Sequence, residues 1–227
     1  MIYGLLGLLL CIGIPAISGI YFACCKKGTL VTFFVGMLTF VITQLVLRLP
    51  ILNLLSSRWD WFSLLPVSSP YLYAAILAFS AGIFEETGRL IGLKYIRRGK
   101  TDWMNGLAFG LGHGGIEAIW VASLGLLPAL FNGTLSMAGI QGLAIGLERL
   151  CAILFHMAMT MLVLHGIRCH SLWGWFLAVL IHGIFDLTVV VQQPVFLWTV
   201  LAVTALSSLF YLLWTKKHWT TKKEITL

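Results

Sequence analysis

Charged residues are scarce in this chain. Only 10% of its 227 residues are Asp, Glu, Lys or Arg, and 59% are hydrophobic. Because a soluble domain carries about 25% charged residues, this composition excludes a soluble protein and indicates a polytopic membrane protein. The net charge of +7 does not indicate nucleic-acid binding, since almost every basic residue stands in a short cluster between apolar runs, as in cytoplasmic loops.

Other missing features narrow the class further. The five cysteines form no Cys-x-x-Cys pair, so the sequence predicts neither a disulfide framework nor a cysteine zinc site. The first apolar run has no basic segment before it and no small-residue cleavage site after it, which favours a retained membrane helix over a signal peptide. No tandem repeat or soluble domain is recognisable, so we expect residues 1–227 to form a single transmembrane domain.

Long apolar runs predict an all-α membrane protein with about seven transmembrane helices. Basic clusters follow the first, third, fifth and seventh runs, so the positive-inside rule predicts an N-terminus outside and a C-terminus in the cytoplasm. The polar, proline-punctuated segment 49–70 is expected to form an interfacial helix on the outer face. The predicted spans are residues 2–24, 29–48, 71–96, 103–126, 139–167, 171–191 and 194–214.

Ionisable residues inside the spans are the candidates for function. A charge at the bilayer centre costs several kcal/mol, so such residues usually line a site or pathway. Counted from the predicted cytoplasmic boundaries, one Glu and three His each lie about 17 Å deep, at the same level of four helices. We therefore expect their side chains to converge on one cavity. The residues at this level are Glu85, His113, His156 and His182.

The neighbours of these residues fit the same interpretation. Glu117 and Asp186 each follow a histidine by four residues, which places each carboxylate on the same helix face as its histidine. A carboxylate beside a ligating histidine is the usual outer partner in a metal site. Glu86 adjoins Glu85, and Arg89 lies one turn beyond it and can stabilise a buried carboxylate. Three histidines with an activated water are also a sound zinc arrangement.

Several alternatives remain open at this point. A single intramembrane histidine can simply bond to a neighbouring helix, and Glu85 with Arg89 can form a structural ion pair. Stacked histidines can ligate haem in an electron carrier, and chains of Glu, Asp and His relay protons in transporters. Glu148 and Arg149 are interpreted as a helix-packing ion pair or an outer-gate feature. The deep carboxylates argue against haem, and the shared depth argues against a transporter.

Three short motifs resemble those of a known superfamily. They are Glu85-Glu86-Thr-Gly-Arg89, Phe109-Gly-Leu-Gly-His113 and His182-Gly-Ile-Phe-Asp186. This order is similar to that of the CAAX prenyl protease and bacteriocin-processing superfamily of intramembrane proteases, although the arginine falls one position earlier here than in most members. The additional Glu117 and His156 are more similar to the PrsW-type and YhfC-type branches, with YhfC the closer. The resemblance covers about residues 71–190, the expected catalytic core.

The resemblance implies an intramembrane, zinc-dependent endopeptidase of a bacterial plasma membrane. It implies that Glu85 activates a metal-bound water, that Glu86 and Arg89 position it, and that His113 and His182, with Asp186, hold the metal or stabilise the oxyanion. His156 would be a third metal ligand. The substrate would be a membrane-embedded or membrane-adjacent peptide, lipidated ones included, with no nucleic-acid partner. An inactive scaffold of the same fold is the remaining alternative.

Hydrolysis also requires water at this depth. We expect the cavity to connect to the cytoplasm or to a lateral gap, along a route lined by Arg89 and by the glycines of the fourth predicted span, among them Gly110 and Gly114.

Overall fold

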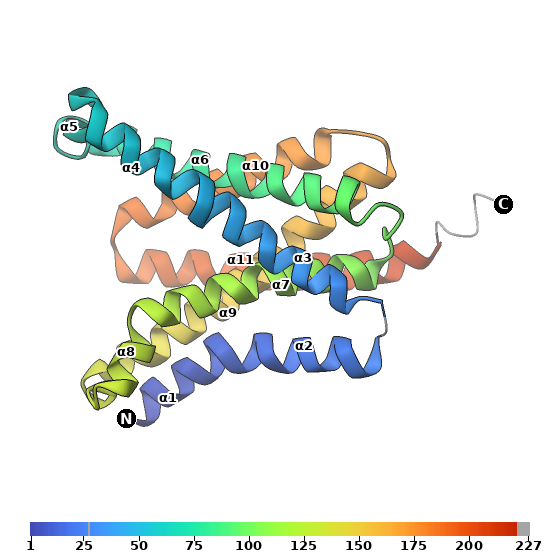
Figure 1. The fold of residues 1–227 in the computed structure, drawn as a ribbon, viewed down its shortest axis with the longest axis horizontal. Coiled ribbons are helices and arrows are strands. Elements are labelled where there is room, and N and C mark those ends of the chain that lie inside the picture. Colours follow the sequence, from blue (N-terminus) through green and yellow to red (C-terminus); the bar gives the residue numbers. More distant parts are fainter. Residues whose placement is uncertain (27, 222–227) are drawn as a thin grey trace.

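Helices make up every regular element in the part of the chain that the computed structural model describes, residues 1–26 and 28–221 (Figure 1). Lys27, Lys222 and Lys223, which belong to the predicted basic clusters, lie outside the described residues. The elements are α1 (Ile2–Leu8), η1 (Leu9–Gly13), α2 (Ile14–Cys25), α3 (Leu30–Phe40), η2 (Val41–Arg48), α4 (Leu49–Arg58), α5 (Asp60–Ser68), α6 (Pro70–Ile91), η3 (Gly92–Ile96), α7 (Trp103–Leu124), α8 (Leu126–Phe131), η4 (Leu135–Ala138), α9 (Gly139–Arg168), α10 (Trp173–Leu187), η5 (Thr188–Val191) and α11 (Pro194–Thr221).

Six of the described helical segments are long and apolar enough to cross a membrane. Helices α5 and α6, with η3 at the end of α6, give a seventh candidate span when they are counted together. The chain bends by 115° between α5 and α6. The prediction of an all-α, multi-pass membrane protein with about seven spans is therefore confirmed. The six segments are Ile2–Cys25, Leu30–Arg58, Trp103–Leu124, Leu135–Arg168, Trp173–Val191 and Pro194–Trp219.

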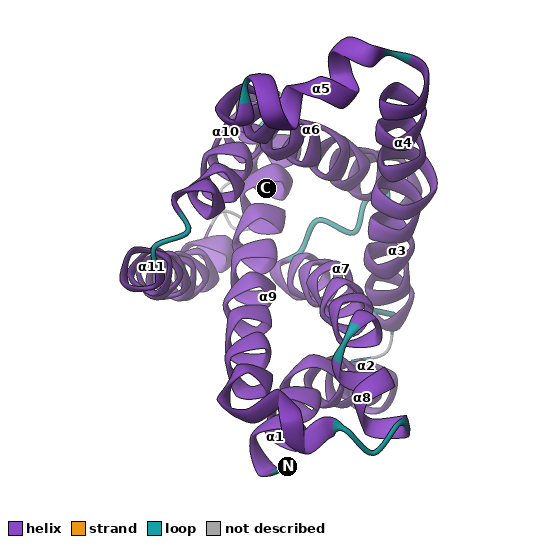
Figure 2. Ribbon diagram, turned by 90° about the vertical axis from the view of Figure 1, so that its left-hand side faces the viewer, coloured by secondary structure: helices purple, strands orange, loops and turns teal. Residues whose placement is uncertain are grey.

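The second span is longer than the sequence predicts. We expected it to end at Arg48, but the helix continues to Arg58 as one segment of 29 residues. Pro50 does not break it: this residue follows the π-helical η2 directly, where the regular α-helical hydrogen-bond pattern is already interrupted. Of the segment 49–70 that we expected to be interfacial, α5 is the part that lies across the end of the bundle (Figure 2). Trp59 and Trp61 are exposed there.

Helix α7 is at the centre of the packing, between α3 and α9, while α6 packs against α10 (Figure 2). Glycines allow the closest of these approaches. A Cβ on Gly36 of α3 would overlap the carbonyl oxygen of Phe109 of α7, and a Cβ on Gly112 would overlap the carbonyl oxygen of Phe33. Small residues of this kind let membrane helices bring their backbones together. This approach brings the segment around His113 against α3.

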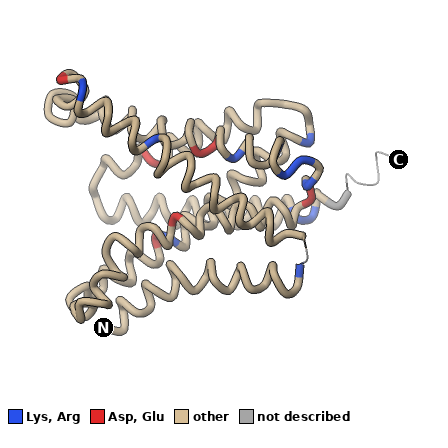
Figure 3. The backbone as a smooth tube through the Cα atoms, in the orientation of Figure 1, with Lys and Arg blue, Asp and Glu red and all other residues tan. Residues whose placement is uncertain are grey.

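The two ends of the bundle differ in charge. Lysines and arginines gather at the end where α11 finishes, which we call the basic end. The end that carries Met1 and α5 is called the opposite end (Figure 3). This separation follows the pattern from which the topology was predicted. The described basic residues at the basic end are Lys26, Lys94, Arg97, Arg98, Lys100, Arg168, Lys216 and Lys217.

We predict that Gly112→Val destabilises the protein by about 1–3 kcal/mol, because overpacking at a backbone contact forces α3 and α7 apart. Thermal unfolding in detergent would measure the change. Gly125→Ala is the matched control, because a Cβ at Gly125 meets nothing within 4 Å. Equal melting temperatures for both variants would contradict the role of this contact.

Candidate intramembrane metal and catalytic site

Four helices bring the predicted residues together inside the bundle. Glu85 comes from α6, His113 from α7, His156 from α9 and His182 from α10. All four are buried, with exposures between 0% and 4%. The expected convergence is therefore confirmed, and it brings these polar groups into contact inside a bundle of apolar helices.

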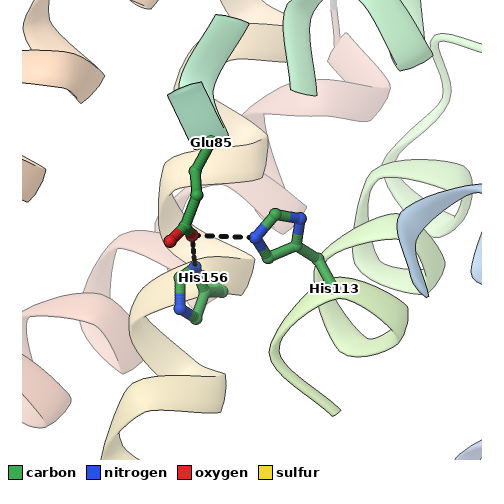
Figure 4. Close-up of side chains that lie close together, drawn as sticks. All are labelled: Glu85, His113 and His156. Carbon is green, nitrogen blue, oxygen red and sulfur yellow. Dashed lines mark hydrogen bonds and ion pairs between the residues drawn. The ribbon is translucent and has the colours of Figure 1, made fainter. Parts of the chain in front are cut away.

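The Glu85 carboxylate lies at the centre of this cluster (Figure 4). Its Oε2 atom is 2.9 Å from Nε2 of His113, 3.9 Å from Nδ1 of His156 and 3.9 Å from Nε2 of His182. Its other oxygen, Oε1, accepts a hydrogen bond from the side-chain amide of Gln44. One carboxylate oxygen thus faces nitrogens from three histidines on three different helices.

Glu86 and Arg89 stand behind Glu85 and are fully buried. Nε of Arg89 is 3.3 Å from Oε2 of Glu86, and Oε1 of Glu86 is 2.8 Å from Nδ1 of His182. Because an ionised carboxylate only accepts hydrogen bonds, Nδ1 of His182 donates to Glu86, and Nε2 is the nitrogen that can bind a metal when the ring is neutral. Glu86 therefore fixes the tautomer of His182 in the way that outer carboxylates fix metal-binding histidines.

His156 has a different hydrogen-bonding state. Nη2 of Arg89 lies 3.1 Å from Nδ1 of His156, and an arginine can only donate. Nδ1 must therefore accept, which places the ring proton on Nε2, 2.6 Å from a carboxylate oxygen of Glu117. Arg89 also donates to the backbone carbonyl of His156 and to the hydroxyl of Thr160. Both ring nitrogens of His156 are thus already engaged by neighbouring side chains.

The two outer carboxylates are placed differently from one another. Asp186 lies beside its own histidine as expected, with Oδ2 3.7 Å from Nε2 of His182. Glu117, expected beside His113, instead contacts helix α9: its oxygens are 2.6 Å from Nε2 of His156 and 2.7 Å from Nη1 of Arg149. The cation of Arg149 attracts Glu117 across the helix interface more strongly than a neutral imidazole on its own helix can.

The donor set fits a divalent metal ion. Ligand atoms of Glu85, His113 and His156 all lie within 4.8 Å of one another, and all three residues are buried. Two ligands of one zinc ion can be at most about 4.2 Å apart, since each bond is about 2.0–2.1 Å long, so a small inward movement suffices. Nδ1 of His113 is buried with no hydrogen-bond partner among the described residues. His182, whose Nε2 lies 3.9 Å from the same Glu85 oxygen, is a further candidate ligand.

Three functional candidates were missed or underrated on the sequence. Gln44 and Arg48, four residues apart in the second span, reach the site from outside the expected core. Nη1 of Arg48 donates to Oε1 of Gln44 at 2.8 Å, which orients the Gln44 amide toward Glu85. Polar residues at helical spacing inside an apolar run were the available signal. Arg149 pairs with Glu148, as expected, but also with Glu117, and so joins the site.

A cavity of about 850 Å³ adjoins the cluster. Glu85, Glu117, His156, His182 and Asp186 contribute to its lining, together with apolar residues of six spans. It lies on the opposite-end side of the cluster.

The lining that we expected for the route, Arg89 and the glycines of α7, is wrong, and the packing of these glycines explains why. A Cβ at Gly110 would lie 2.6 Å from Cα of Met157, and one at Gly114 would lie 3.0 Å from Cα of Ile153. These glycines are packed against α9 and leave no passage there. Arg89, the other residue expected along this route, is fully buried.

We predict that Gln44→Leu weakens metal binding by about 10–100-fold, the usual effect of removing an outer partner of a metal ligand. Titration of the purified protein with Zn²⁺ would measure it. Thr43→Val is the matched control, because the Thr43 hydroxyl bonds only to the carbonyl of Thr39 in its own helix. Wild-type affinity in Gln44→Leu would show that Gln44 does not position Glu85.

Comparisons with known proteins agree with the motifs. A family model described as YhfC intramembrane metalloprotease matches in two overlapping segments, residues 9–139 and 130–207. The "Uncharacterized membrane protein YhfC" of Bacillus subtilis (strain 168) is 25% identical over 193 residues, covering 73% of this chain and 74% of the relative. No solved structure matches the chain. Since the family model spans most of the sequence, the chain belongs to the YhfC intramembrane metalloprotease family.

Proposed function

We propose that the protein is an intramembrane metallopeptidase that hydrolyses a peptide bond of a membrane-embedded or membrane-adjacent substrate. One observation carries the proposal: a single oxygen of Glu85 faces nitrogens of three buried histidines at the inner end of a cavity of about 850 Å³. Hydrolysis requires a carboxylate that can accept a proton, imidazole nitrogens beside it and space for water and substrate. Glu85 has all three, because no arginine or lysine forms an ion pair with it among the described residues. The family name supports the same reaction.

Glu85 acts as the general base. Its carboxylate takes a proton from a water molecule, whose oxygen forms a bond to the carbonyl carbon of the scissile peptide. The carbon–nitrogen bond then breaks, and Glu85 returns the proton to the leaving amine, so the products are a carboxylic acid and an amine. Gln44 holds the other oxygen of Glu85 and thereby fixes the direction of Oε2. General acid–base catalysis by a positioned side chain contributes about 10²–10⁴-fold.

Glu86 is less suited to this role. It is fully buried, it pairs with both Arg89 and His182, and it does not line the cavity. A base that cannot meet water or substrate cannot transfer the reacting proton. We therefore assign Glu86 and Arg89 to positioning: Glu86 orients His182, and Arg89 orients Glu86 and His156.

The metal, which we propose to be Zn²⁺, would be held by histidines of the cluster. When bound, such an ion supplies Lewis-acid polarisation of the substrate carbonyl and promotes deprotonation of water. His182 is the strongest candidate, because its Nδ1 contacts Glu86 and its Nε2 faces Glu85 at 3.9 Å. His113 would bind through Nε2 in exchange for its hydrogen bond to Glu85. His156 is the weakest of the three candidates, because Arg89 already donates to its Nδ1.

Haem binding is less well supported than hydrolysis. A haem site requires apolar walls around its axial histidines, but carboxylates or Arg89 lie within 4 Å of every histidine in this cluster. The catalytic unit that we propose also extends beyond residues 71–190, because Gln44 and Arg48 belong to the second span.

We predict that Glu85→Gln lowers turnover by about 10²–10⁴-fold, because the amide retains the size of the side chain but cannot accept the proton. Glu86→Gln should cost less, since it only weakens the orientation of His182. No substrate is needed in advance: new N-termini can be counted by mass spectrometry after wild-type or variant protein is reconstituted with a membrane-protein extract.

Metal content and melting temperature are measured on both variants. Those of Glu85→Gln should remain at the wild-type level, whereas Glu86→Gln should have a lower melting temperature because Arg89 loses its charged partner. A wild-type rate for Glu85→Gln with an inactive Glu86→Gln would reverse the two roles. New N-termini that are the same in all three samples would identify an inactive scaffold and remove the hydrolytic function.

A second prediction concerns the different contributions of His182 and His156 to zinc binding, which follow from their hydrogen-bond partners. His182→Ala should abolish stoichiometric zinc binding, whereas His156→Ala should weaken it by about 10–100-fold, as expected for an outer partner. Metal analysis of the two purified variants at increasing zinc concentration distinguishes the cases. The reverse order of losses would mean that Arg89 releases His156 to the metal.

A further inference from the structure

The cavity does not extend past the cluster on any helix that lines it. Going toward the basic end, its last lining residues are Phe40 on α3, Glu85 on α6, Glu117 on α7, His156 on α9, His182 on α10 and Leu201 on α11. Beyond this level, no residue nearer the basic end on these helices lines it. In the other direction, the lining continues to residues with exposed side chains, among them Leu49, Pro70 and Gln192. The cavity is therefore continuous with the surface at the opposite end.

The half of the bundle on the basic-end side of the cluster is closed by packing. Arg89, Phe109, Met161 and Leu164 are all 0% exposed, and Leu93 is 1% exposed. A Cβ added to Gly106 would come within 3 Å of both Met161 and Leu164. Close-packed protein interiors have few voids larger than a water molecule. Neither water nor a peptide can reach Glu85 from the basic end without unpacking α7 from α9.

We propose that substrate and water reach Glu85 only from the opposite end, and that the substrate is an apolar peptide segment in the half of the bilayer nearest that end. This rests on the proposed peptidase function for its chemistry, while the direction of access rests on the cavity alone. Under the positive-inside rule the opposite end faces outward, so the cleaved segment lies in the outer leaflet or directly beside it.

The walls indicate what kind of segment fits. Leu45, Leu77, Val121, Phe155 and Phe185 line the cavity above the cluster and present apolar surface to a ligand. A volume of about 850 Å³ falls within the range of about 300–1,000 Å³ that holds drug-sized ligands. A few residues in an unwound conformation fit such a space, but a helix of about 10–12 Å diameter with its side chains does not fit together with its flanking turns.

Thiol labelling tests the direction of access without requiring turnover. The five native cysteines are replaced first, since three of them are exposed. Single cysteines are then placed at Ala81, a cavity-lining residue one turn from Glu85, and at Met161, a buried residue of the closed half. Ser136→Cys marks the opposite end and Lys100→Cys marks the basic end, because both positions are exposed. A charged, membrane-impermeant methanethiosulfonate is applied to intact cells and, separately, to inverted vesicles.

We expect Ala81→Cys to be labelled in whichever preparation labels Ser136→Cys. In the preparation that labels Lys100→Cys but not Ser136→Cys, Ala81→Cys should not be labelled at all. Met161→Cys should remain unlabelled in both. Labelling of Ala81→Cys together with Lys100→Cys, or in neither preparation, would overturn the proposal. Repeating the test with Glu85→Gln separates the two questions: cleavage is lost if the peptidase assignment is right, while sided labelling persists if the direction of access is right.

Discussion

The site depends on the mutual neutralisation of charges that are buried inside the bundle. A series of side chains with alternating charge and hydrogen-bonding roles connects four helices, from Arg149 through Glu117, His156, Arg89 and Glu86 to His182. Each member would be costly alone in the bilayer, and removing one partner of a buried ion pair typically costs about 3–5 kcal/mol. The relative positions of α6, α7, α9 and α10 are therefore fixed by electrostatic requirements as well as by apolar packing.

This series also explains how neighbouring, chemically similar residues take different roles. Glu85 and Glu86 are adjacent, but only Glu86 meets the guanidinium of Arg89 directly, which leaves Glu85 directed toward the histidines and the cavity. His156 and His182 both lie near Glu85, yet a donor faces one and an acceptor faces the other. Proton positions on the imidazoles follow from these neighbours, because arginine only donates and an ionised carboxylate only accepts.

Much of the fold and the centre of the site could be predicted from the sequence, because the bilayer imposes strong constraints. Apolar runs define the spans, and the cost of burying charge made Glu85 and the three histidines conspicuous at one depth. The partner of Glu117 could not be found in the same way, since spacing along a helix identifies neighbours on that helix and not a cation on the next one. The second span was underestimated at Pro50, whose effect depends on the π-helical turn before it. Gln44 was overlooked because its run reads simply as an ordinary span.

The closed half of the bundle has an electrical consequence for the cell. A cavity that penetrates to mid-depth leaves only the packed layer around Arg89, Phe109 and Met161 between its inner end and the basic end. Most of a membrane potential would fall across this closed half of the bundle, where it amounts to about 2.3 kcal/mol per elementary charge per 100 mV. The described residues at the basic end are packed without a continuous path for ions. The membrane could therefore hold its ion gradients although the protein has a polar site inside it. Tight packing at the basic end thus matters for energy conservation as much as for the stability of the protein.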